Sequence, residues 1–405
     1  EIFLSPAGSD LPVDQLGPIQ LNAPPPAPGE GILVFWNSFS AYTPLQAGRR
    51  WDGAHTGPFG GRHGLLHLLQ AARANKTPLF LLDLLTSQSL AALESVVGLE
   101  PVRQMQASGL LGLAIPMLGL PSDPDANLAL DPPPAWAIRR SLAENQAASA
   151  AFGFSGLRFL YAPGGEATLA SLPRLNPGGW VFLPGGQTHA EIALAPTWPE
   201  NLAGWKSLRL PNLPAPLQAI QQADEDGPTL PVRRALIAAA LDSAGREAES
   251  GPLVVLGGDL PSSAWGSPAA ARASLNYLQN HPWIHILSPA ELAARFPSQG
   301  SDGLSRENTL PETGPWWLQT LQQAPENGPA RGAWLAYQAS FAPVFPYDPS
   351  LSDLRSIYTR TTPAWLAASA WAESAYQEAD CRQDLDGDGE VECLLASEQV
   401  FTIFK

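Results

Sequence analysis

Short apolar runs recur at regular intervals along the first 300 positions of the chain. Each run holds four to six residues and is bounded by loop-forming residues, a pattern typical of strands buried on both faces of a parallel sheet. The runs occupy residues 31–36, 78–82, 110–115, 156–161, 180–183, 207–210, 253–256 and 283–287.

The stretches between these runs have helical character, most clearly at residues 62–75, 135–151, 231–249 and 267–279. Alternation of strand and helix indicates βαβ units around a parallel sheet, and seven or eight repeats favour closure into a barrel. No Gly-x-Gly-x-x-Gly follows the first run, which removes the main support for a dinucleotide-binding sheet. We therefore predict an α/β protein built on a (β/α)7–8 barrel.

The pattern divides the chain into four parts. Residues 1–30 are rich in Pro and Gly and form an extended lead-in, and residues 31–300 form the barrel. Residues 301–380 form a helical appendage, with Trp-rich helical segments at 315–323, 332–342 and 350–378. Residues 381–405 hold an acidic loop and a terminal strand at 399–404. That strand either pairs with an earlier strand or belongs to a longer protein.

The acidic loop near the C-terminus resembles a calcium site. Asp384, Asp386 and Asp388 stand at alternating positions with two glycines among them, and hard oxygen ligands at positions 1, 3 and 5 are what calcium needs. An EF-hand would place a Glu at position 12, where this chain has Leu395, so Glu390 and Glu392 are the additional candidate ligands. We predict a structural calcium site, as opposed to a solvated acidic turn.

The chain has two cysteines, Cys381 and Cys393, and they bracket this loop. A disulfide between them would stabilise the fold by about 3 kcal/mol in the loop-entropy model, whereas the alternative is two free thiols. Structural disulfides persist in oxidising compartments, so we expect a secreted or cell-surface protein. A first residue other than Met agrees with removal of a leading segment.

The amino-acid composition limits the classes of partner that this chain can bind. The 38 acidic and 23 basic residues give a net charge of −15, which excludes nucleic acid as a partner because binding to it needs clustered Lys and Arg. No apolar run is long enough to span a membrane. The thirteen tryptophans suit stacking on sugar rings, although most of them are expected to pack in cores.

Candidate chemistry follows from the barrel, whose active site lies at the carboxyl ends of the strands. Glu166 and Asp259 come shortly after two of the apolar runs, and Asp83 is a third carboxylate after another. Two carboxylates facing each other can hydrolyse a glycosidic bond, one as nucleophile or base and one as acid. The alternative is that these side chains simply cap loops.

Further residues are candidates for substrate binding. They lie after the first strand, in the Gly-rich loop 49–57 and in the loop after Asp259, and are Asn37, Trp51, His55 and Trp265. No Gly-x-Ser-x-Gly motif is present, and both cysteines are assigned to a disulfide, so acyl transfer by a Ser or Cys triad is not expected.

Residues 31–380 resemble the broad group that contains glycoside hydrolase family 57 and the polysaccharide deacetylases. The resemblance rests on Phe35-Trp36-Asn37-Ser38-Phe39, on residues 255–259 with Trp265-Gly266, on residues 280–284 and on the helices after the barrel. It implies a (β/α)7-type barrel with a Glu nucleophile and a later Asp acid/base, which Glu166 and Asp259 match by order.

The chain also departs from this group. Asn37-Ser38-Phe39 replaces the His-Gln-Pro-like motif after the first strand, and the Asp-Asp pair with His-x-x-x-His of metal-dependent deacetylases is absent at the expected places. Two hypotheses remain. The first is an exported glycoside hydrolase-like enzyme acting on an α-glucan or related polysaccharide. The second is a non-catalytic glycan-binding or assembly protein, which could self-associate through strand addition at its terminal strand.

Overall fold

The structure is a computed structural model of the 405-residue chain. It describes residues 3–4, 14–15, 29–36, 65–96, 98–119, 133–155, 159–163, 179–183, 200–202, 205–210, 254–259, 272, 275–276, 278–280, 284–295, 316–341, 349–385 and 389–404. Within the Pro-rich lead-in, β1 (Phe3–Leu4) and β2 (Asp14–Gln15) form a short antiparallel pair.

All eight predicted apolar runs contain strands. In chain order these strands are β3 (Gly29–Trp36), β4 (Leu79–Leu81), β5 (Leu111–Pro116), β6 (Phe159–Tyr161), β7 (Trp180–Leu183), β9 (Trp205–Arg209), β10 (Val254–Asp259) and β11 (Ile284–Ile286). All of them pair in parallel, and β8 (Glu200–Leu202) adds an antiparallel strand beside β9.

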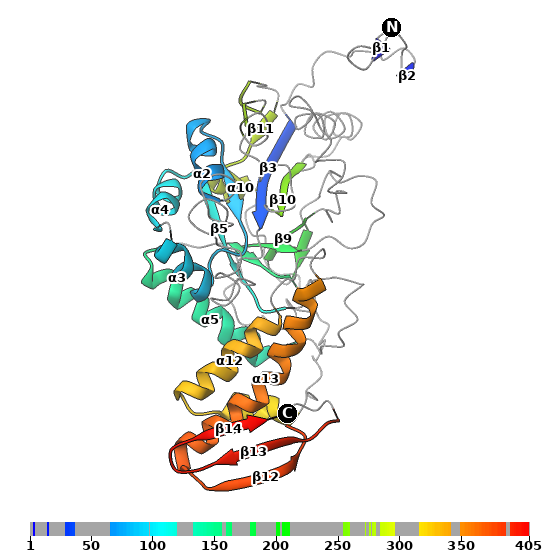
Figure 1. Cartoon of the computed structure of the whole chain (residues 1–405). Coiled ribbons are helices and arrows are strands. Elements are labelled where there is room, and N and C mark those ends of the chain that lie inside the picture. Colours follow the sequence, from blue (N-terminus) through cyan, green and yellow to red (C-terminus); the bar gives the residue numbers. More distant parts are fainter. Residues whose placement is uncertain are drawn as a thin grey trace.

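The order of the strands in this sheet is that of a barrel. The parallel strands β3, β4, β5, β6, β7 and β9 follow one another in chain order, and β10 returns to pair with β3, the first of them. In the described part of the chain, β10 does not pair with β8 or β9, so the barrel is open on that side and the sheet forms a half-barrel (Figure 1). The α/β class and the barrel architecture predicted from the sequence are confirmed.

Helices cover the outer face of the sheet. They are α2 (Leu65–Ala74), α3 (Ser87–Val96), α4 (Glu100–Ala107) and α5 (Ala135–Ala151). Alternate strand residues such as Leu33, Leu81 and Leu113 pack beneath them in one core. Helices α2 and α5 were predicted, and the predicted segment 231–249 lies outside the described residues.

The inner face of the sheet carries a second core. The rings of Phe80, Phe159 and Phe182 meet there, with centroids 5.2 to 6.1 Å apart. Leu292 of α10 (Pro289–Arg295) joins the same cluster. Because β11, which leads into α10, pairs with the first residues of β3, this packing lies toward the amino ends of the strands. The carboxyl ends are therefore the place to look for a site.

Among the described residues, three helices follow the barrel, in the region where the sequence predicts Trp-rich helical segments. They are α11 (Trp316–Gln323), α12 (Gly328–Ser340) and α13 (Pro349–Ser374). Trp317, Trp334 and Leu366 belong to the same hydrophobic cluster as the outer-face core, so the appendage continues that core. No helix in the described part of the chain is both long and apolar enough to cross a membrane.

A separate three-stranded antiparallel sheet ends the chain (Figure 1). It consists of β12 (Glu378–Gln383), β13 (Glu392–Ala396) and β14 (Phe401–Phe404). The predicted terminal strand thus pairs with an earlier one, β13. Trp371 joins this sheet to α13, since its Nε1 donates to the carbonyl of Ser397 at 2.7 Å and its ring lies 5.8 Å from that of Phe401.

Candidate active site at the carboxyl edge of the barrel

Two of the three predicted carboxylates lie at the same edge of the sheet. Asp259 is the last residue of β10 and pairs with Trp36, the last residue of β3. Asp83 comes two residues after β4, on the other side of β3. Because neighbouring strands are about 4.8 Å apart, the backbones of the two aspartates are separated by two strand spacings, about 10 Å.

The other predicted site residues are not placed. Glu166, Asn37, Trp51, His55 and Trp265 lie outside the described residues, and only the backbone of Asp259 is described. Their assignments as catalytic or substrate-binding residues stay predictions.

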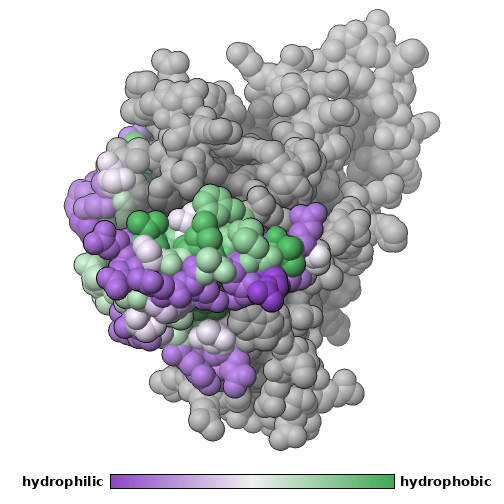
Figure 2. Space-filling model, turned by 60° about the horizontal axis from the view of Figure 1, so that its bottom comes forward, coloured by the Kyte–Doolittle hydropathy of each residue, from purple (hydrophilic) through white to green (hydrophobic). Residues whose placement is uncertain are grey.

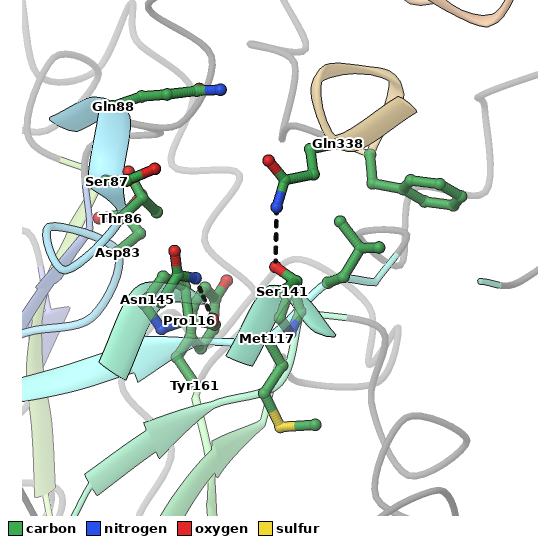
Figure 3. A pocket seen from close by; sticks show the side chains of 13 residues that line it. Asp83, Thr86, Ser87, Gln88, Pro116, Met117, Ser141, Asn145, Tyr161 and Gln338 are labelled. Atoms are coloured by element: carbon green, nitrogen blue, oxygen red, sulfur yellow. Dashed lines mark hydrogen bonds between the residues drawn. The ribbon is translucent and has the colours of Figure 1, made fainter. Parts of the chain in front are cut away.

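A cavity of about 60 Å³ opens at the carboxyl ends of β4, β5 and β6 (Figure 3). Asp83 and the first residues of α3 form one side of it, α5 contributes Ser141 and Asn145, and α12 contributes Gln338 and Phe341. The appendage therefore helps to enclose the edge at which a barrel enzyme places its catalytic groups.

The polar side chains around this cavity are held in place. Asp83 is 2% exposed and Asn145 is 5% exposed. Asn145 Nδ2 donates to the carbonyl of Pro116 at 3.1 Å, which fixes its amide against the end of β5. Thr86 caps α3, because its Oγ1 accepts a hydrogen bond from the N–H of Ser89 at 3.0 Å. The cavity thus combines a buried carboxylate with fixed neutral polar groups.

Glu144 of α5 joins the barrel to the helix that borders the cavity. Its carboxylate accepts hydrogen bonds from Trp334 Nε1 at 2.7 Å and from Arg331 Nη1 at 2.8 Å. Arg140 lies 3.4 Å from the same carboxylate and places its guanidinium 4.4 Å from the centre of the Trp334 ring. Gln338 Nε2 reaches Ser141 Oγ and Glu144 Oε2, each at 3.4 Å.

Sequence reasoning missed Glu144 and Gln338. Both lie inside helical segments with no motif around them, and the contact between them joins positions 194 apart in the chain. The i,i+4 spacing of Arg140 and Glu144 was visible, but it predicts only a surface ion pair.

Several contacts stabilise the conformation of the acidic C-terminal loop. Cys381 of β12 and Cys393 of β13 form a disulfide, as predicted. Gly389 has a φ of +88°, a left-handed conformation that favours glycine, and its N–H donates to Asp384 Oδ2 at 3.0 Å. The buried carboxylate of Glu392 accepts the N–H of Leu385 at 2.7 Å.

The calcium site itself stays a prediction. Glu390 is exposed, whereas Asp386 and Asp388 lie outside the described residues. Among the residues that the structure describes, no group of three or more His, Cys, Asp or Glu side chains is arranged so that it could hold a metal ion.

No protein-family model and no curated protein matches the chain. The 4-alpha-glucanotransferase from Thermococcus litoralis has a similar structure, with 12% identity and a TM-score of 0.55 over 94% of this chain. This chain spans 65% of the length of that enzyme.

Two further solved structures show weaker similarity. A GH57 branching enzyme from Thermococcus kodakaraensis has 10% identity and a TM-score of 0.48, covering 86% of this chain and 92% of its own. A probable polysaccharide deacetylase from Pseudomonas aeruginosa has 15% identity and a TM-score of 0.42, covering 66% of this chain and 90% of its own. Solved structures similar to this chain thus include GH57 enzymes and polysaccharide deacetylases, and the chain shares the fold of the Thermococcus litoralis glucanotransferase.

Proposed function

We propose that this chain is a carbohydrate-active barrel protein that hydrolyses an α-glucan or related polysaccharide by a two-carboxylate mechanism. The observation that carries the proposal is the position of Asp83 and Asp259 at the same carboxyl edge of the sheet, where Asp83 lines a cavity. The α-glucan is taken as the first substrate to test because the similar glucanotransferase is named for that class.

In the proposed mechanism Glu166 acts as the nucleophile and Asp259 as the acid/base. The acid donates a proton to the leaving oxygen of the glycosidic bond while the other carboxylate attacks the anomeric carbon or activates water. Asp83 is the reserve partner of Asp259.

Turnover on a panel of polysaccharides tests this proposal. Amylose, xylan and chitin are offered to the wild type and to Glu166→Gln, Asp259→Asn and Asp83→Asn, with release of reducing ends as the measurement. We expect activity on amylose, with a large loss in Glu166→Gln and Asp259→Asn. If Asp83 and not Glu166 is the partner of Asp259, the large losses of activity should appear in Asp83→Asn and Asp259→Asn. Activity that survives all three changes would rule out the two-carboxylate mechanism.

The C-terminal sheet supports a second candidate function, assembly of copies of this chain. In the part of the chain that the structure describes, β14 is an edge strand, and it has no charged residue. Leu395 and Phe404 of this sheet and Val400 next to it are 43%, 52% and 59% exposed. Figure 2, which turns this end of the molecule forward, shows apolar residues gathered in a patch bordered by hydrophilic ones.

The two edges of this sheet differ in a way that favours pairing at β14. The opposite edge, β12, carries Glu378, Asp380 and Arg382 and has an irregular register between Asp380 and Gln383. Charges and bulges protect an edge strand from pairing, and β14 has neither. A second copy joining β14 to β14 would extend the sheet across two molecules.

Sedimentation velocity tests this assembly. The wild type should populate dimers at micromolar concentrations, and Phe404→Lys should shift it to monomer by placing a charge on the edge strand. Gln322→Lys, which adds the same charge at an exposed position of α11, is the control and should leave the distribution unchanged. A wild type that stays monomeric at high concentration excludes assembly through β14.

We also propose that the chain is exported and that its C-terminal loop binds calcium in a structural role. The disulfide supports export, because such bonds persist in oxidising compartments. The left-handed Gly389 and its bond to Asp384 match the sharp turn that calcium loops need.

Calorimetric titration of the folded chain with calcium tests the loop directly. Wild type should bind one ion, and Asp384→Asn should weaken binding at least tenfold. Chelation should raise the protease sensitivity of residues 378–404 before that of the barrel. Equal heats for wild type and Asp384→Asn would exclude the site.

A further inference from the structure

We infer that the exposed indole of Trp365, on α13 of the appendage, is a platform on which a sugar ring of a polysaccharide stacks. Trp365 does not line the cavity at the carboxyl edge, so the platform is a second point of contact with the glycan. The inference rests on the proposed function for its choice of ligand, and it deepens that function by giving the appendage a part in glycan binding.

Trp365 differs from the other tryptophans whose side chains the structure describes. Those are buried or half-buried, whereas Trp365 is 45% exposed. The indole N–H groups of Trp334 and Trp371 donate hydrogen bonds. The rings of Trp136 and Trp317 lie against another aromatic ring. Trp365 makes neither kind of contact with any residue in the described part of the chain, so its N–H and much of its ring are open to a ligand.

One face of the Trp365 indole lies on α12, which packs beside α13 (Figure 1). A Cβ added to Gly332 would be 2.8 Å from Cδ2 and Cε3 of the indole and 3.2 Å from Cε2. Because Cδ2 and Cε2 are the atoms shared by the two rings of the indole, an approach this close to both comes from above a face and not from the rim. Gly332 thus supports one face, and the exposure of the side chain comes from the opposite face and the edges.

The residues next to this ring are short. On α13, Thr361 and Ala368 lie one turn before and one turn after Trp365, and on α12 Gly328 lies one turn before Gly332. Among the described residues, the other exposed large hydrophobic side chains belong to residues 391–404, at the C-terminal sheet. A stable protein partner buries about 800 Å² on each side of an interface, whereas one aromatic side chain supplies at most about 250 Å². A lone ring on a low surface therefore fits a small flat ligand better than a protein.

The chemistry of the ring favours a sugar. The face of an aromatic ring is electrically negative, and the C–H groups on one face of a pyranose ring carry a slight positive charge. The indole N–H at the ring edge can donate to an oxygen of the same sugar. Cages for quaternary ammonium ions use several aromatic rings, and Trp365 has no ring neighbour among the described residues. The net charge of −15 disfavours polyanions.

Fluorine NMR of the full-length chain labelled with 5-fluorotryptophan tests the platform at the residue itself. The chain carries Asp259→Asn so that the probe, maltohexaose, is not consumed. The resonance of Trp365 is identified by its absence from the same chain carrying Trp365→Phe, whose remaining resonances show whether the fold is kept. Sorbitol at an equal concentration of hexose units is the control, because it has the hydroxyls of a hexose but no ring.

We expect the Trp365 resonance to shift with maltohexaose and to reach saturation with a Kd of about 1 to 10 mM, the range for contact with one or two sugar units. Sorbitol should leave the resonance in place. Tetramethylammonium chloride tests the competing ligand class, a cation held by the ring face. A Trp365 resonance that does not move with maltohexaose, or that moves equally with sorbitol or more with tetramethylammonium, overturns the inference.

Retention in an amylose-containing gel gives a second test, with unlabelled chain in the same Asp259→Asn background. Trp365→Ala removes the platform and should weaken retention at least about fivefold, the low end for stacking a ring on an aromatic side chain. Phe404→Ala, at an exposed aromatic residue of β14, is the matched control and should leave retention unchanged. Equal retention of the two variants would also overturn the inference.

The outcomes separate this inference from the proposed function. If the wild type degrades amylose but the Trp365 resonance does not respond to maltohexaose, the platform is wrong and the enzymatic proposal stands. If the Trp365 resonance responds but the wild type shows no turnover, the platform stands and the hydrolytic proposal is wrong.

Discussion

Gly332 shows how one residue sets the packing of the appendage. It lies in α12 beneath the indole of Trp365 on α13, and an added Cβ would be 2.8 Å from two ring atoms. Both helices would have to move apart, so we expect Gly332→Ala to lower the free energy of unfolding by about 1 to 3 kcal/mol. Urea denaturation followed by tryptophan fluorescence measures this loss.

Gly328 in the same helix is the control. No atom lies within 4 Å of the position that its Cβ would take, so Gly328→Ala should change stability by less than about 1 kcal/mol, in the stabilising direction. Equal destabilisation by the two substitutions would show that steric conflict with Trp365 is not the cause.

At the residue scale the sequence identifies candidates by their position after apolar runs. For Asp83 and Asp259 this position is the carboxyl edge of the sheet, because the end of a buried parallel strand fixes where the next residue lies, and their catalytic roles stay predictions. The same reasoning fails for Glu144 and Gln338, whose importance comes from contacts between helices far apart in the chain. Only the packing of α12 on α5 reveals them.

At the element scale, Glu144 connects helix α5 to helix α12. Removing it in Glu144→Ala leaves the N–H of the fully buried Trp334 without its acceptor, and an unsatisfied buried donor costs about 1 to 3 kcal/mol. We expect a loss of stability of that size in thermal or urea unfolding. Glu144→Gln keeps an acceptor oxygen and should lose less than half as much. Equal losses would contradict the hydrogen-bond account.

The contribution of the start of α10 to the stability of the fold should depend on pH. Glu291 Oε2 accepts the N–H of Ser288 at 2.8 Å, while Ser288 Oγ accepts the N–H of Glu291 at 3.2 Å, which makes a capping box. The backbone hydrogen bond from Ser288, with a smaller contribution from His285, lowers the pKa of Glu291 below its ordinary 4.5.

Because the folded pKa is lower than the unfolded one, the ionised carboxylate stabilises the fold above about pH 4.5, and this stability is lost as the pH falls through the folded pKa. Glu291→Gln should therefore cost about 0.5 to 1 kcal/mol at pH 7 and little at pH 3. Unfolding of both proteins at the two pH values measures the difference. A difference that does not change with pH would contradict the assignment.

At the element scale the sequence predicts the barrel well and the C-terminal sheet poorly. Runs such as 180–183 are apolar on both faces, which marks them as buried strands wherever they occur. Strand β12 is Glu-Ala-Asp-Cys-Arg-Gln, mostly polar, and it is held by pairing with β13 and by the disulfide. The strand is stabilised by residues distant in the sequence, and the hydrophobic periodicity of the strand itself cannot predict these contacts.

At the scale of the whole molecule, barrel and appendage form one unit around the candidate site. The outer-face core runs from Leu33 and Leu113 in the sheet to Trp334 and Leu366 in the appendage. The same contact places Gln338 beside the carboxyl edge. A catalytic site at that edge would therefore include side chains from both parts of the chain.

The release of reducing ends from amylose tests the central claim most directly. The measurement compares the wild type with Asp259→Asn at equal concentration, after thermal unfolding has shown that both are folded. The account predicts turnover by the wild type and a kcat about 10² to 10⁴ lower in Asp259→Asn, the range for loss of a general acid or base. No release by the wild type, or equal release by both proteins, would contradict it.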